Sequence, residues 1–134
     1  MGSIIWPYLF RPTMKYPEFP NHEKYTQIQT ILNGECDGEV CVRGWIYRTR
    51  SSGKLAFIVL RDSTGNIQST VSKKNVSESA FSDARKALIE SSVIVKGIPA
   101  KDDRAPGGWE IRATDFQVVH FAIFPLIPFA LISK

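Results

Sequence analysis

Apolar and polar residues alternate with a period of two over much of the stretch between residues 40 and 72. In VCVRGWIY, which begins at Val40, every second residue is apolar or glycine, and Arg43, Trp45 and Tyr47 lie among the residues between them. The segment LAFIVL is apolar throughout and rich in branched side chains, and IQSTVS alternates once more. Since two is the side-chain period of an extended chain, the pattern predicts three β-strands.

Two polar segments separate these strands. RSSGK (residues 50–54) and DSTG (residues 62–65) both have the composition of tight turns. We expect Gly65 to adopt a positive φ, because glycine takes up that conformation without steric cost.

The period changes after the third strand. SESAFSDARKALIESS places Phe81, Ala84 and Leu88 at helical spacing on one face. Ser77 or Ser79 is expected to cap the first turn through its hydroxyl. The sequence therefore predicts one helix that begins near residue 77 and continues to about residue 92.

Two more strands are predicted after the helix, at residues 93–98 and 109–119, with the loop RAPGG before the second. Three strands, a helix and two strands is the element order of the OB-fold, a five-stranded Greek-key barrel. An SH3-like barrel lacks the helix, and a ferredoxin-like fold needs a helix after its first strand. We therefore expect an all-β fold with one helix between strands three and four.

The expected organisation has three parts. Residues 1–37 read as an irregular extension, with four prolines among the first twenty residues and a short helical turn near residues 23–31. Residues 38–120 form the barrel. Residues 121–134 form an apolar tail, interpreted as a truncated linker; its apolar run is shorter than the ~20 residues that a membrane span needs.

The amino-acid composition limits the possible classes of protein only slightly. A chain of 134 residues with 43% hydrophobic residues suits one globular domain, and a net charge of +4 mildly favours a polyanionic partner. Cys36 and Cys41 are interpreted as free thiols, since nothing else suggests a secreted disulfide scaffold and no cluster of metal ligands accompanies them. We expect a cytoplasmic protein without a membrane segment.

Cations and aromatic residues gather on the predicted sheet. The stretch RGWIYRTRSSGKLAFIVLRDSTGNIQ (residues 43–68) carries five basic residues and one acid. Phe57 has the strand parity of Arg61, opposite to Ile58, and Gln68 is opposite in parity to its apolar neighbours. Single-stranded nucleic acids are bound by such sheets, where basic residues follow phosphates and rings stack on bases. Read alone, a phenylalanine in an apolar strand is more often part of the core than a stacking platform, and a glutamine such as Gln68 on an outward face is usually only solvated.

The same stretch resembles the N-terminal anticodon-binding domain of class IIb aminoacyl-tRNA synthetases, the aspartyl, asparaginyl and lysyl enzymes. Their pattern, G-W-(V/I)-x-x-x-R-x-x-G-x-x-x-F-(I/L)-x-(L/I)-R-D-x-x-G-x-x-Q, is matched without a gap. ESSV before the fourth strand and the RAPGG loop resemble the asparaginyl members of archaeal type. The resemblance covers about residues 38–125.

The resemblance implies a role for individual residues. Phe57 aligns with the phenylalanine that stacks on the central anticodon base, and Gln68 with the glutamine that hydrogen-bonds anticodon bases. Arg50 and Arg48 align with arginines that contact the anticodon loop. Glu110 aligns with a glutamate that touches the third anticodon base in aspartyl enzymes.

The implied partner is a tRNA, by resemblance asparagine tRNA, bound with a salt dependence to which Lys54 contributes beside the two arginines. A homodimer is also implied by the family. The family's catalytic domain, which uses ATP and magnesium, has no counterpart among the motifs of this sequence. We therefore expect a truncated or free-standing domain with no catalytic residue, metal ligand or cofactor of its own.

Three alternatives stay open on the sequence. They are a general single-strand-binding module, the anticodon domain of an aspartyl enzyme, and an interaction module that docks a partner through its apolar tail.

Overall fold

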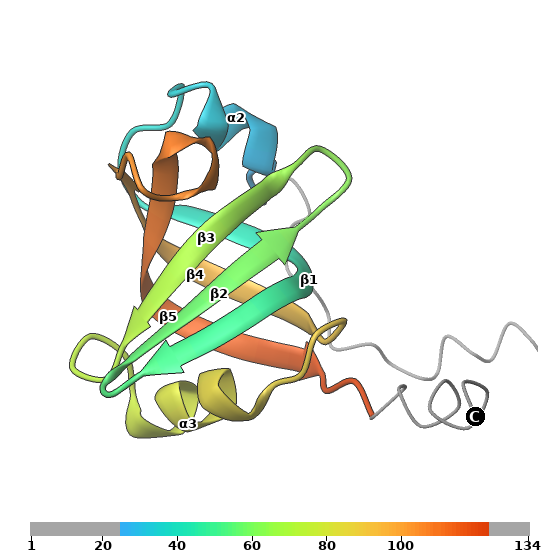
Figure 1. Ribbon diagram of the computed structural model, residues 1–134. Helices are drawn as coiled ribbons and strands as arrows, with labels where there is room; N and C mark the ends of the chain where they lie inside the picture. The colour runs from blue at the N-terminus through green and yellow to red at the C-terminus, as the bar shows by residue number, and fades with distance from the viewer. Residues whose placement is uncertain (1–24, 124–134) are drawn as a thin grey trace, which may run out of the picture.

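The alternating strands close into a barrel (Figure 1). Along β2 (Leu55–Arg61) and β3 (Asn66–Ser72), every second side chain is buried. The structure, a computed structural model, describes residues 25–123. Around the barrel the strand order is β1-β2-β3-β5-β4, and β4 pairs with β1 to complete the circle. The strands are β1 (Val40–Ser52), β2 (Leu55–Arg61), β3 (Asn66–Ser72), β4 (Ser92–Lys101) and β5 (Trp109–His120).

One strand pair differs from the others in direction. β3 and β5 run parallel, whereas the remaining four neighbouring pairs are antiparallel. The main helix, α3 (Glu78–Lys86), lies between β3 and β4 in the chain and covers one end of the barrel (Figure 1). The five-stranded OB-fold expected from the element order is thus confirmed.

Strand parity separates the core from the surface as the sequence predicts. In β2, the side chains of Ala56, Ile58 and Leu60 are fully buried, while those between them are partly exposed. Ile67 and Val71 continue the same inward face on β3. Phe57 therefore lies on the outer surface of the barrel, and the core reading of this residue is wrong.

Helix α3 begins as expected and ends early. The Ser77 hydroxyl accepts a hydrogen bond from the Ala80 amide at 3.1 Å. The helix stops at Lys86, because Ala87 adopts an extended conformation, and the chain then turns to pair with β1 through Glu90. The expectation of a helix to residue 92 is wrong, and Leu88 is 43% exposed instead of buried.

A short helix joins the core ahead of the barrel. The helical turn expected near residues 23–31 is observed as α2 (Ile28–Leu32), and its Ile28 and Ile31 are completely buried. The last part of the predicted irregular extension thus packs against the barrel. The proline-rich start of the chain, and the tail beyond residue 123, lie outside the described residues.

Asp62 fastens α2 to the β2–β3 turn. One carboxylate oxygen accepts a hydrogen bond from the Ile28 amide at 3.0 Å. The other accepts from the amides of Thr64 and Gly65, at 2.7 and 3.1 Å. This side chain, not a positive φ, holds the turn: Gly65 is absent from the positive-φ glycines of the described residues, so the expectation for it is wrong.

A 3₁₀ turn, η4 (Pro106–Gly108), precedes β5, with Gly107 and Gly108 at positive φ. No helix among residues 25–123 has the length and apolar character needed to cross a membrane.

We expect Gly44→Ala to destabilise the barrel. A Cβ atom at Gly44 on β1 would overlap the backbone carbonyl oxygen of Arg61 on β2. Forcing these strands apart should lower the free energy of unfolding by roughly 1–3 kcal/mol, measured by urea denaturation. Gly65→Ala is the control, because its Cβ meets nothing nearer than 3.5 Å. Equal losses in both variants would refute the close-approach argument.

Candidate nucleic-acid interface

The strand register brings two rows of polar and aromatic residues side by side on the outer face of β1, β2, β3 and β5. In the first row, Phe57 on β2 pairs with Arg50 on β1 and with Thr70 on β3. Thr70 in turn pairs with Arg112 on β5. We call the outer face that carries this row and the next one the β1–β2–β3–β5 face.

The second row lies directly beside the first. Val59 on β2 pairs with Arg48 on β1 and with Gln68 on β3. Gln68 then pairs with Glu110 on β5. Five of the six residues predicted for the site therefore lie in two adjacent rows. The sixth, Lys54, is exposed in the turn between β1 and β2, next to the Arg50–Phe57 end.

A bulge in β1 is what turns the two arginines outward. Ile46 pairs with the inward-facing Leu60, and Arg48 pairs with the outward-facing Val59, so Tyr47 is one extra residue in the strand. Without this insertion Arg48 and Arg50 would share the parity of Ile46 and point into the core. The strand also continues to Ser52, so the predicted turn at residues 50–54 is shorter than expected and Arg50 belongs to β1.

Phe57 and Arg50 form a stacked pair at the centre of the first row. The guanidinium carbon of Arg50 lies 4.3 Å from the centroid of the Phe57 ring. Arg50 is exposed and the ring is half-buried. A cation held against an aromatic ring is stabilised by the ring's negative face, and the pair offers solvent a flat surface that carries positive charge.

Glu110 lies at the β5 end of the face in a buried position, although its row faces outward. The residue is only 7% exposed. Its Oε1 accepts a hydrogen bond from the Thr70 hydroxyl at 2.6 Å, and its Oε2 accepts one from Nε of Arg112 at 3.2 Å. The one carboxylate in the two rows is therefore neutralised within the face, which leaves the net charge of the rows positive.

Arg61, another cation of the stretch 43–68, has a different role. Its guanidinium forms an ion pair with Glu90 at 3.0 Å and lies about 6 Å from the rings of Trp45 and Tyr47. Its neighbour Asp62 is engaged instead by α2 and the turn. The ion pair thus links β2 to the segment that follows α3.

Sequence reasoning missed Thr70 and Arg112. Both belong to the first row, yet β3 and β5 are separated by some forty residues and pair in parallel. The only local signal was that Arg112 follows Glu110 at the spacing that puts two strand residues on one face.

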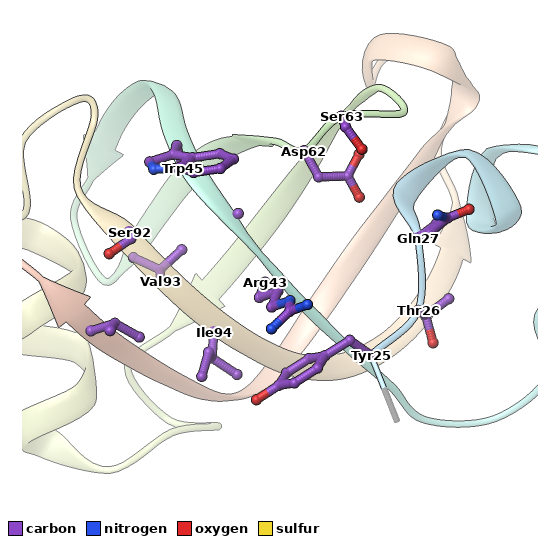
Figure 2. Close-up of a pocket in the computed structure, with 12 residues that line it drawn as sticks. Tyr25, Thr26, Gln27, Arg43, Trp45, Asp62, Ser63, Ser92, Val93 and Ile94 are labelled. Atoms are coloured by element: carbon purple, nitrogen blue, oxygen red, sulfur yellow. The ribbon is translucent and has the colours of Figure 1, made fainter. Parts of the chain in front are cut away.

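A separate pocket of about 550 Å³ opens elsewhere on the barrel, over β1 and β4 (Figure 2). Arg43, Trp45 and Ile94 are among the residues that line it, together with Tyr25 from the segment before α2. The Arg43 guanidinium lies 4.5 Å from the centroid of the Tyr25 ring. The pocket contains none of the six predicted site residues, so it is distinct from the β1–β2–β3–β5 face.

The thiols and the acids of the described region show no metal chemistry. Cys36 and Cys41 are free, and burial raises the pKa of both thiols; at Cys41 the charge of Lys96 partly opposes that rise. Among residues 25–123, no three histidine, cysteine or acidic side chains gather in a group that would hold a metal ion.

Comparisons with known proteins agree with this geometry. A family model described as an OB-fold nucleic acid binding domain, tRNA_anti-codon, matches residues 40–119. An asparagine–tRNA ligase of Pelotomaculum thermopropionicum is 45% identical over 84 residues, which is 63% of this chain and 20% of that protein. One of Thermococcus gammatolerans is 46% identical over 94 residues, or 69% of this chain and 22% of that protein.

A solved structure shows the same similarity. Asparaginyl-tRNA synthetase of Pyrococcus horikoshii, crystallised with asparaginyl-adenylate, superposes with a TM-score of 0.71 at 37% identity. The match covers 78% of this chain and 24% of that one. This chain thus spans about a fifth of the length of the curated relatives it matches.

We expect Phe57→Ala to leave the free barrel nearly as stable as before. Because the ring lies on the surface, the substitution should remove little more than its contact with Arg50, worth about 1 kcal/mol. Ile58→Ala, one residue away but fully buried, should cost about 2–5 kcal/mol. Urea denaturation of the two variants measures both losses, and comparable losses would contradict the surface position of Phe57.

Proposed function

This chain belongs to the tRNA anticodon family of OB-fold nucleic acid binding domains, and on that premise we propose that its β1–β2–β3–β5 face binds the anticodon loop of a tRNA. The observation that carries the proposal is the outward-facing Phe57 ring with Arg50 stacked on it at 4.3 Å. Unpaired loop bases stack on aromatic rings and on guanidinium planes. The pair therefore supplies a platform for one splayed base.

The residues around the platform supply the other two parts of single-strand recognition. Arg48, Arg50 and Lys54 lie at the β1–β2 end, where their charges can follow the phosphates of a bound loop. Gln68 lies in the next row, and its amide offers both a donor and an acceptor to a base edge. Glu110 completes the set at the β5 end. The proposed role needs no metal or cofactor from this part of the chain.

The proposed partner is asparagine tRNA. The relatives described above are asparagine–tRNA ligases, one of them 45% identical over 84 residues, and the family model that matches residues 40–119 covers the proposed face. In an enzyme of that kind, we propose, this domain holds the anticodon loop in the cytoplasm while a separate catalytic domain joins asparagine to the tRNA with ATP. Pairing of two such enzymes into a homodimer belongs to the same proposal.

A titration with RNA stem-loops tests the function. We expect the 134-residue chain to bind a stem-loop with the anticodon GUU more tightly than one with GUC or an unstructured oligonucleotide. Phe57→Ala should weaken binding by roughly 1–3 kcal/mol, since one base stack is lost. Trp45→Ala is the control, an exposed aromatic residue that lines the separate pocket. Equal affinity for all three RNAs would identify a general single-strand binder. An unchanged affinity in Phe57→Ala would refute the proposal that a base stacks on Phe57.

The salt dependence of binding tests the phosphate contacts. Each cation that neutralises a phosphate releases a counterion, so Arg48→Ala and Arg50→Ala should each lower the slope of log K against log salt by about 1. Lys86→Ala removes an exposed cation on α3, outside the proposed face, and should leave the slope unchanged. A slope that all three substitutions change equally would mean that only the net charge matters.

A further inference from the structure

The burial of Glu110 restricts what its carboxylate can reach. Its side chain is only 10% exposed, and each of its two oxygens already accepts a hydrogen bond, from Thr70 and from Arg112. A base edge would have to approach a carboxylate that the protein almost completely covers. The geometry therefore disfavours Glu110 as the group that touches RNA directly.

Arg112 has the opposite properties. Its side chain is 66% exposed, and only its Nε is engaged, at 3.2 Å from Glu110. No described residue accepts a hydrogen bond from its two terminal nitrogens. The terminal edge of a guanidinium presents two parallel N–H groups, which fit any partner that has two acceptor atoms side by side.

We propose that Arg112 is an RNA-contacting residue at the β5 end of the face, and that Glu110 is a positioning residue that acts through it. This inference rests on the proposed function and extends it. The ligand is a pair of adjacent acceptors on a loop nucleotide, either the N7 and O6 atoms of guanine or two oxygens of one phosphate.

The position of Arg112 suits a nucleotide next to the one on the platform. Arg112 and Phe57 belong to the same row, two strands apart, which corresponds to about 10 Å between their backbones. Thr70 lies between them and fixes Glu110 from the other side. A flexible arginine loses side-chain freedom on binding, and the ion pair with a carboxylate that is itself held in place removes part of that freedom beforehand.

The test is a double-mutant cycle on the affinity for the GUU stem-loop, using Arg112→Ala, Glu110→Gln and the double variant. Arg112→Ala should weaken binding about 5- to 150-fold, the range for one bidentate contact. Glu110→Gln should also weaken binding, although it removes a negative charge that would repel RNA. In the Arg112→Ala background, Glu110→Gln should have no further effect, because its contribution passes through Arg112.

A control variant, a lysine variant and an altered loop sequence show whether Arg112 acts at all and which acceptor it contacts. Arg104→Ala is the control, because Arg104 is also an exposed arginine that pairs with an acid two residues before it, Asp102; its affinity should equal that of the wild type. Arg112→Lys keeps the charge but not the paired donors. If Arg112 contacts a phosphate, Arg112→Lys should retain most of the affinity for every loop sequence. If Arg112 contacts a guanine, Arg112→Lys should bind as weakly as Arg112→Ala. It should then also bind equally well to a loop in which that guanine is replaced.

Three results would overturn the inference, and they differ from failure of the proposed function. If Arg112→Ala binds the stem-loop as tightly as the wild type while Phe57→Ala binds it more weakly, the proposed anticodon site stands and Arg112 has no part in it. Tighter binding in Glu110→Gln would show that the carboxylate only repels RNA and does not position Arg112. Additive losses of affinity in the double variant would show that Glu110 contacts RNA itself. Absence of binding by a folded wild-type chain would remove both proposals. Urea denaturation of each variant confirms that it is folded.

Discussion

The parallel pairing of β3 with β5 is the constraint on which both the barrel and the candidate site depend. It closes an otherwise antiparallel sheet, and its register sets Gln68 opposite Glu110 and Thr70 opposite Arg112. The same closure buries Ile111 in the core. Stability and recognition thus follow from one strand pair: its inward residues fill the barrel, and its outward residues extend the face that begins at β1 and β2.

The bulge at Tyr47 is the second constraint, and it acts on charge. An extended strand of thirteen residues cannot bury Ile46 and also present Arg48 and Arg50 to solvent unless its parity changes once. The extra residue makes this change, so the two halves of β1 present their outward side chains to two different surfaces. Before the bulge, β1 faces the pocket with Arg43 and Trp45; after it, β1 places its arginines beside Phe57.

What the sequence predicts and what it does not follows from the range of each interaction. Local patterns were sufficient for the strands of the barrel and for the Ser77 cap, whereas strand parity alone left Phe57 open to the core interpretation that the structure overturns. The end of α3 was mispredicted, because contacts with β1 after residue 87 outweigh the helical spacing of Leu88. The contact of Glu110 with Thr70 was unpredictable for a similar reason, because it joins residues 40 positions apart. The turn at Gly65 was mispredicted for a local reason: the Asp62 carboxylate accepts from the Thr64 and Gly65 amides and holds the turn without a positive φ. Recognition of the family pattern identified the candidate residues, and the structure adds the geometry that relates them.

The central claim is that RNA meets the β1–β2–β3–β5 face and not the pocket over β1 and β4. The most direct measurement is a map of backbone amide chemical shifts by NMR as the GUU stem-loop is added to the isotope-labelled chain. We predict that the perturbed amides cluster around Phe57, Gln68 and Arg112. Perturbations centred on Tyr25, Trp45 and Ile94, with the sheet face unaffected, would place the RNA in the pocket and contradict the account.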